Sequence, residues 1–261
     1  MSDHLSNTDT ALAGENEQEK GIPSTPYQNE DVDVLPPRTG YLRVNYYKRT
    51  PGQRQYPSSC AAGLAMLGVT LWPLGLILCE ARSVTSPAVL GGTLFFASGL
   101  VQIITGIWAI VDNNLFGSVV LLCLGAFFMS FGSFAVDLFG VNSAYTDPLQ
   151  VANAEGIFLS TWVAFTFIIW ISTFKSTWPL FLFTFFLWLF FLLFDIAVFG
   201  SHQGCKIASG VFAFLTSMCA FYAMYDGLSE NTNSYAPVPS AKILRMPGAY
   251  HVPAEDRVQI V

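Results

Sequence analysis

Two long apolar stretches lie in the first half of the chain, on either side of a short polar link. Residues 91–111 and 115–134 are both apolar, and Asp112, Asn113 and Asn114 separate them. At about 1.5 Å rise per residue, a helix of roughly 20 residues crosses a hydrocarbon core of about 30 Å. A helix hairpin in a soluble protein would carry a polar face, and neither stretch has one. The sequence therefore predicts two membrane-spanning helices joined by a tight turn.

The composition of the whole chain also indicates a membrane protein. Of the 261 residues, 52% are hydrophobic and 11% are charged, whereas an average soluble domain has about 25% charged residues. Acidic residues are crowded into the first 35 positions, which indicates a solvated tail and no nucleic-acid binding. The five cysteines show neither metal-ligand spacing nor a disulfide framework. We therefore expect no bound metal and no cofactor.

The same reasoning along the chain predicts an all-α polytopic membrane domain of six helices over residues 60–226. The expected spans are residues 60–78, 89–111, 116–136, 154–174, 180–199 and 207–225. Residues 137–153 are expected to form the longest connection, and residues 200–206 a short loop. Residues 1–59 are polar and contain several prolines, which predicts a disordered N-terminal tail, and residues 227–261 form a second polar tail.

The positions of lysine and arginine predict the orientation in the membrane. Four cations between Arg43 and Arg54 precede the first helix, and Lys175 lies in a loop on the same side. The loops on the other side carry only Arg82 and Lys206. Because cytoplasmic loops are enriched in cations, we expect both termini to be cytoplasmic.

Two polar side chains inside the expected spans are candidates for a functional role. Gln102 lies in the middle of the second helix, where it must face either another helix or a water-filled path. Asp195 lies within the fifth helix, about one turn from its outer end. A carboxylate within a span suggests a proton-linked function, although at this depth it can also reach the water of the headgroup region.

Small and aromatic residues in the spans predict how the helices pack. Gly99 and Gly106 on the second helix, and Gly125 and Gly132 on the third, are seven residues apart and form smooth strips. Such strips allow close helix packing and also leave room for a narrow path. We expect the dense aromatic residues of the fifth helix to face lipid. They are Phe181, Phe183, Phe185, Phe186, Trp188, Phe190 and Phe191.

No arrangement typical of an enzyme is visible in the sequence. It contains no glycine-rich phosphate loop, no HExxH motif and no convincing Ser/His/Asp trio. We therefore expect no catalytic activity.

Several motifs resemble the acetate uptake transporter family, which includes bacterial acetate/succinate permeases and fungal ammonia-export/acetate-uptake proteins. Residues 99–108, GLVQIITGIW, resemble the family motif GGxxQxxxGxW. Residues 114–117, NLFG, followed by GAFF at 125–128, resemble NTFG and SYGxFW. YTDP at 145–148, WVAFTF at 162–167 and KSTW at 175–178 are similar to the fungal branch. The resemblance covers about residues 58–228, which is essentially the whole predicted membrane domain.

The resemblance implies a fold and a solute path. The family protomer is a compact six-helix unit similar to urea/amide channels, assembled as a homo-hexamer in the plasma membrane, with one path per protomer. Alignment with the family places Leu67, Leu124 and Leu187 at the constriction of that path. It also implies that the substrate path includes Gly63, Gly99, Gln102 and Asn114. Where the family opens its first helix with NPxPLGL, this chain has SSCAAGL at residues 58–64.

The function implied by the resemblance is transport of acetate and other short monocarboxylates, coupled to protons or as the neutral acid. The first alternative is a channel or exporter for ammonia or another small neutral solute, which an aliphatic constriction would also suit. The second is a non-transporting relative that senses or regulates. Loss of the NPxPLGL segment favours this last alternative, and retention of Gln102 and Asn114 disfavours it.

Overall fold

The computed structural model describes residues 59–112, 114–229, 244 and 246–247, so the expected N-terminal tail and most of the C-terminal tail lie outside the described residues. Within the described part, six helical spans are long and apolar enough to cross a membrane, which confirms the predicted all-α membrane class. The spans are α1 (Cys60–Leu78), η3 with α2 (Thr93–Val101 and Gln102–Val111), α3 (Leu115–Ala135), α5 (Pro148–Ser172), α6 (Trp178–Gly200) and α7 (Gln203–Leu228). Three short helices lie in the connections: η1 (Ala81–Ser83), η2 (Pro87–Leu90) and α4 (Val141–Ala144).

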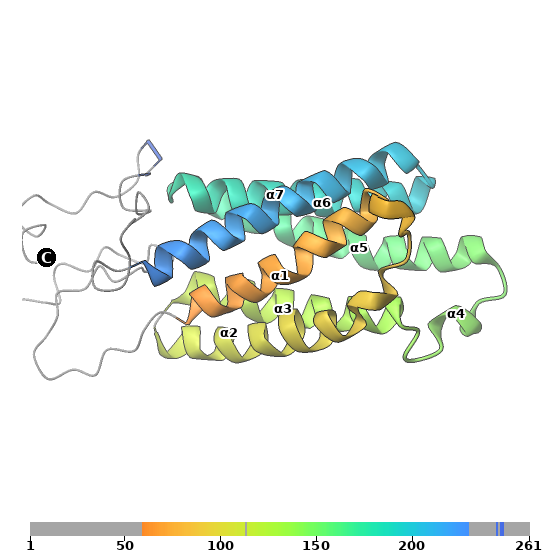
Figure 1. The fold of residues 1–261 in the computed structure, drawn as a ribbon, viewed down its shortest axis with the longest axis horizontal. Coiled ribbons are helices and arrows are strands. Elements are labelled where there is room, and N and C mark those ends of the chain that lie inside the picture. The colour runs from red at the N-terminus through yellow and green to blue at the C-terminus, as the bar shows by residue number, and fades with distance from the viewer. Residues whose placement is uncertain (1–58, 113, 230–243, 245, 248–261) are drawn as a thin grey trace, which may run out of the picture. The chain divides into compact units, whose positions relative to one another are not determined.

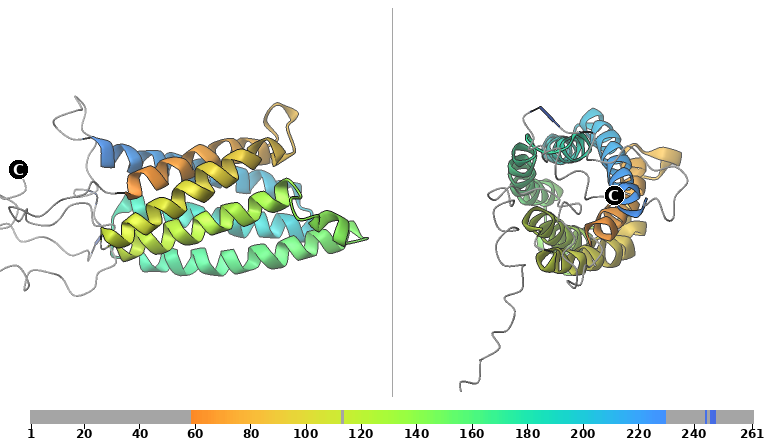
Figure 2. Two further views of the ribbon diagram at one scale, coloured as in Figure 1. Left: turned by 90° about the horizontal axis from the view of Figure 1, so that it is seen from below. Right: turned by 90° about the vertical axis from the view of Figure 1, so that its left-hand side faces the viewer.

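The six spans form a closed ring when the bundle is viewed along its helices (Figure 2). Helix α1 packs between α7 and the η3–α2 span, α2 packs on α3, and α6 packs between α5 and α7. Aromatic contacts join α3 to α5 and complete the ring: the Phe127 and Trp162 ring centroids are 5.0 Å apart, as are those of Phe134 and Phe158. The first residue of α1 and the last residue of α7 lie at the same end of the bundle (Figure 1).

Helices α1 and α7 approach so closely that their backbones touch. A Cβ atom added to Gly75 would lie 2.6 Å from the carbonyl oxygen of Gly210, and one added to Gly210 would lie 2.6 Å from the carbonyl oxygen of Gly75. Farther along the same contact, the Ser217 hydroxyl donates a 2.9 Å hydrogen bond to the carbonyl oxygen of Gly68. Small residues thus let two helices pack without the hydrophobic driving force that water would supply.

The two glycine strips of the second and third spans face each other inside the protomer. A Cβ atom on Gly125 would lie 3.0 Å from the carbonyl oxygen of Gly99, and one on Gly106 would lie 2.9 Å from the backbone nitrogen of Leu122. The strips therefore serve close packing of the second span on α3.

Helices α5 and α7 begin earlier than their apolar runs predicted. Helix α5 starts at Pro148 instead of residue 154, because the Asp147 carboxylate accepts a 3.0 Å hydrogen bond from the backbone nitrogen of Leu149 and Pro148 occupies the first turn. Helix α7 starts at Gln203 instead of residue 207, so only residues 201 and 202 separate it from α6. The first turn of each helix mixes polar and apolar residues, so a search for continuous apolar runs overlooks it.

The second span contains a π-helix that its sequence did not reveal. Thr93–Val101 has π-helical hydrogen bonding, and regular α-helix resumes at Gln102. Within this segment the Ser98 hydroxyl donates to the Thr70 hydroxyl at 2.7 Å and contacts the carbonyl oxygen of Met66 at 3.0 Å. π-helical turns occur frequently at functional sites, where they change which side chains face a neighbouring helix.

The expectation that the aromatic residues of α6 face lipid is wrong for three of them. Phe183, Phe190 and Phe191 are at most 2% exposed and belong to the main buried cluster. The reason is geometric. Helix α6 also contributes to the interior enclosed by the ring, and large side chains must fill that interior.

An ion pair ties the beginning of α7 to the connection that follows α1. The ammonium group of Lys206 lies 3.2 Å from the carboxylate of Glu80, and both side chains are partly exposed. Hydrogen bonds from the side chains of Gln203 and Lys206 hold the pKa of Glu80 below its usual value.

Replacing Gly75 with alanine should destabilise the bundle. The new methyl group would meet the Gly210 carbonyl oxygen on α7, which cannot move without shifting that helix. Overpacking of this kind costs about 1–3 kcal/mol, so the midpoint of thermal unfolding in detergent should fall. Gly92→Ala is the matched control, because a Cβ atom there meets nothing within 4 Å. Equal midpoints for the two variants would contradict the close α1–α7 contact.

The contact between Glu80 and its partners should make stability depend on pH. Because the pKa of Glu80 is lowered in the folded protein, its stabilising contribution is present above the ordinary glutamate pKa and disappears as pH falls through the lowered value. Unfolding midpoints of the wild type and Glu80→Gln should therefore differ near neutral pH and converge in acid. A difference that stays constant with pH would show that the carboxylate charge contributes nothing.

Candidate functional site

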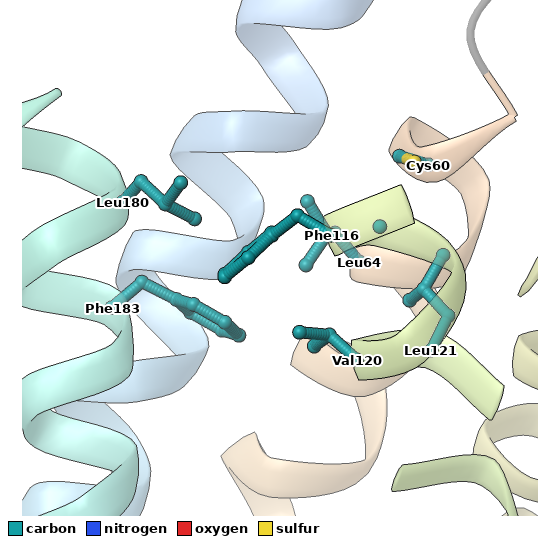
Figure 3. Close-up of a pocket in the computed structure, with 8 residues that line it drawn as sticks. Cys60, Leu64, Phe116, Val120, Leu121, Leu180 and Phe183 are labelled. Carbon is teal, nitrogen blue, oxygen red and sulfur yellow. The ribbon is translucent and has the colours of Figure 1, made fainter. Parts of the chain in front are cut away.

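An apolar cleft opens at the end of the bundle where α1, α3 and α6 begin. It contains about 240 Å³ of space not filled by atoms, part of which is open to solvent. Figure 3 shows side chains from all three helices around it. The lining residues are Cys60, Leu64, Phe116, Gly117, Val120, Leu121, Leu180 and Phe183. The cleft is thus an apolar recess at the same end of the bundle as the first residue of α1 and the last residue of α7.

The three leucines predicted at the constriction lie one helical turn deeper than this cleft. On each helix a cleft residue precedes the leucine by three or four positions: Leu64 and Leu67 on α1, Val120 and Leu124 on α3, and Phe183 and Leu187 on α6. Steps of three or four keep the same helix face and advance about 5 Å along the axis. Each of the three leucines has no exposed surface, and all belong to one buried cluster. We call these three residues the leucine layer.

Beyond the leucine layer the interior becomes aromatic. The next two turns of the three helices contribute fully or nearly fully buried side chains: Leu71, Phe128 and Phe191, then Leu74, Phe131 and Phe194. The centroids of the Phe131 and Phe194 rings are 5.9 Å apart, so α3 and α6 meet across the interior. The axis of the protomer is therefore closed by hydrocarbon side chains over several turns.

Charge is nearly absent from the three helices that line the axis. Helices α1 and α3 carry no charged side chain between their bounds, and α6 carries only Asp195. Asp195 is half-buried directly after Phe194, and its Oδ1 atom is buried without a hydrogen-bond partner among the described residues. An ion that entered this interior would lose its hydration without gaining a paired charge.

Gln102 is the most unusual polar residue of the interior. It has no exposed surface, and neither its Nε2 nor its Oε1 atom has a hydrogen-bond partner within the described part of the chain. Leaving a buried amide unpaired costs about 1–3 kcal/mol. The interhelical hydrogen bond that was one of the two expectations for Gln102 is therefore not formed with any described residue.

The other predicted path residues have packing or capping contacts. The Asn114 side-chain oxygen accepts a 2.9 Å hydrogen bond from the Gly117 backbone nitrogen, and its Nδ2 atom lies 3.3 Å from the Cys60 sulfur. Asn114 thus caps α3 at the edge of the cleft. A Cβ atom on Gly63 would lie 2.6 Å from the Thr105 hydroxyl, and one on Gly99 would lie 2.4 Å from the Met129 side chain. These two glycines allow neighbouring helices to approach each other closely.

Two features at the cleft end were not predicted from the sequence. The Asp112 carboxylate accepts hydrogen bonds from the Ser59 backbone nitrogen at 3.1 Å and from its hydroxyl at 2.9 Å, so the polar link after α2 holds the start of α1. The backbone of the C-terminal tail also returns to the α5–α6 loop. Trp178 donates to the Leu244 carbonyl oxygen at 2.8 Å, and Met246 donates to that of Ser176 at 3.1 Å. Neither contact leaves a local sequence signal, because each joins residues far apart in the chain.

Comparison with known proteins places this architecture in a family. The chain is 34% identical to "Ammonia transport outward protein 3" of Saccharomyces cerevisiae over 81% of this chain and 76% of that protein. It is 30% identical to "Acetate permease A" of Emericella nidulans over 82% of this chain and 75% of that protein. The solved structure of the bacterial acetate channel SatP has the same fold, with a TM-score of 0.61 at 22% identity, covering 70% of this chain and 99% of that one.

A family match confirms the resemblance seen in the sequence motifs. It extends over residues 40–245, which includes all six spans and Leu244 of the tail. The chain therefore belongs to the GPR1/FUN34/yaaH family.

Proposed function

We propose that this protein is a membrane transporter or channel for acetate and other short monocarboxylates, which pass as the neutral acid or together with a proton. The proposal includes no catalytic step. The observation that carries it is the apolar axis, in which a small apolar recess precedes the leucine layer by one helical turn. The relative named as an acetate permease supports the choice of substrate.

The leucine layer explains why the solute should cross without net charge. A carboxylate that passes Leu67, Leu124 and Leu187 would meet no polar atom of these side chains, and an unpaired ion at such depth costs several kcal/mol. Protonation of the carboxylate removes this cost. Asp195 is the one carboxylate within the described spans of α1, α3 and α6, and we assign it a proton-linked role beyond the aromatic part of the axis.

Ammonia or another small neutral solute is the second candidate function. The relative named as an ammonia transport protein favours it, and an aliphatic constriction admits a neutral amine as readily as a neutral acid. A regulatory role without transport is the third candidate function, and an experiment must distinguish it from the two transport functions.

The direct test is uptake of labelled acetate and labelled methylammonium into proteoliposomes at two opposite pH gradients. Acetate transport predicts uptake above that of protein-free vesicles, driven toward the alkaline side. Ammonia transport predicts uptake of methylammonium toward the acid side. Uptake of neither solute above the protein-free level would overturn both transport proposals and leave the regulatory one.

Leu124→Ala should raise solute flux, because it removes three carbon atoms from the narrow leucine layer. The variant should also lose about 2–5 kcal/mol of stability, as other buried leucine truncations do. Leu159→Ala is the matched control: Leu159 on α5 is equally buried but does not lie on the three helices that line the axis. If Leu159→Ala raised flux as much as Leu124→Ala, the position of the constriction would be wrong.

We also propose that the protein lies in the plasma membrane with both termini cytoplasmic and functions as a homo-hexamer. The cations before α1 support the orientation. The start of α1 and the end of α7 also lie at the same end of the bundle, as two termini on one side of the membrane require. Protease added outside intact cells should cleave the connection near Tyr145 and spare both tails. The purified protein in mild detergent should have the mass of about six protomers. Cleavage of the N-terminal tail from outside would contradict the orientation, and a monodisperse monomer would contradict the assembly.

A further inference from the structure

The unpaired amide of Gln102 lies at the level where the cleft meets the leucine layer. Ser98, in the last turn of the π-helical segment, precedes Gln102 by four residues, and Thr105 follows it by three residues of α-helix. Ser98 contacts Met66 and Thr70 of α1, while Thr105 meets α1 at Gly63. Gln102 therefore lies beside the turn of α1 that contains Leu64 and Leu67.

The contacts between the second span and α3 place Gln102 at the same level along the bundle. A Cβ atom on Gly125 would lie 3.0 Å from the Gly99 carbonyl oxygen and 2.9 Å from the Ile103 side chain, so Gly125 packs beside the turn that includes Gln102. Leu124 is the neighbour of Gly125 in the chain. Contacts with two helices thus place Gln102 at the level of the leucine layer.

The neighbouring hydroxyls already have partners, which distinguishes them from the amide. Ser98 bonds to Thr70, and the Thr105 hydroxyl donates to the Val101 carbonyl oxygen at 2.8 Å. Of these three polar side chains, only that of Gln102 has a donor group (Nε2) and an acceptor (Oε1) that are buried without a partner among the described residues. A buried polar group without a partner requires an explanation, and one explanation is a ligand that is bound only transiently.

We propose that the Gln102 side chain binds the solute at the entrance to the leucine layer and selects the protonated carboxylic acid over the carboxylate. The proposal rests on the transport function proposed above. An acid and a primary amide form two matched hydrogen bonds: the acid O–H donates to Oε1, and the Nε2–H donates to the acid carbonyl oxygen. A carboxylate has no proton to donate, so Oε1 would remain unpaired and would face a negative charge.

The pH dependence of this selection must come from the solute. The elements packed against Gln102 are α1, η3 and α3, and within their bounds and those of α2 the structure has no Asp, Glu, Lys, Arg, His or Tyr. Their titratable groups are the thiols of Cys60 and Cys123, which are neutral in acid. No protein charge near the amide changes over the pH range in which acetic acid dissociates.

The same chemistry predicts a second class of solute. Acetamide offers one N–H donor and one carbonyl acceptor in nearly the shape of acetic acid, and it stays neutral at every pH of interest. It should therefore pass through the protein, and its flux should not depend on pH.

The experiment measures acetate and acetamide flux into proteoliposomes of the full-length protein, after subtraction of the flux into protein-free vesicles of the same lipid. For the wild type, acetate flux should fall about tenfold for each pH unit above the pKa of the acid, because the neutral fraction falls by that factor. Acetamide flux should remain constant. In Gln102→Leu both fluxes should fall about tenfold or more. The unfolding temperature of this variant should rise, because the unpaired buried amide has been removed.

Ser98→Ala is the matched control, because Ser98 is equally buried one turn away but its hydroxyl is already paired. It should lower the unfolding temperature and leave both the acetate flux and the acetamide flux at their wild-type levels. The inference is overturned if Gln102→Leu folds and retains wild-type flux of both solutes, or if acetate flux does not follow the neutral fraction. A wild type that passes neither solute overturns the proposed function itself, which is a different result.

Discussion

The structure depends on one constraint: a polar group in a hydrocarbon core must find its partner inside the protein. Most buried hydroxyls of this protein satisfy the constraint locally, by donating to a backbone carbonyl of their own helix. Thr166 does so to Trp162 at 2.7 Å, and Thr216 to Phe212 at 2.7 Å. Others join helices, as Ser217 joins α7 to α1. The side-chain amide of Gln102 is an exception, because its donor and its acceptor are both buried without a hydrogen-bond partner among the described residues.

Close helix packing is the second condition for the internal axis. Where glycines meet glycines, as on α1 and α7, helices come near enough for backbone atoms to touch, and the ring of spans closes. The large side chains of α3 and α6 then point into a confined interior. The same interior therefore supplies the stability of the bundle and, under the proposed function, the apolar route across it.

The sequence predicted the number and type of the membrane spans, because length and hydrophobicity alone determine both. It did not predict that the second span is π-helical at Thr93–Val101, since no residue pattern there differs from an α-helix. Apolar runs gave the start of α1 at Cys60 correctly but missed the first turn of α5. The Asp147–Pro148 signal is visible in the sequence, but the same residue types are also typical of a turn.

The candidate site was only partly accessible from the sequence. Leu67, Leu124 and Leu187 are ordinary leucines within apolar helices, and only resemblance to a family singled them out. The structure adds that each follows a cleft residue by one turn, a relation among three distant segments that no local pattern records. The roles of Asp112 and Leu244 could not be predicted for the same reason, since their partners are distant in the chain.

The leucine layer and the aromatic turns beyond it also determine where the membrane voltage acts. A voltage drops across the part of a path that excludes water and ions, and it does about 2.3 kcal/mol of work per elementary charge for each 100 mV. Here that part spans several helical turns, so an acetate ion would feel most of the voltage, whereas an acid molecule without net charge feels none. Under the proposed function, a cell with this protein in its membrane would therefore equilibrate the acid with its surroundings without drawing current, whatever its membrane potential.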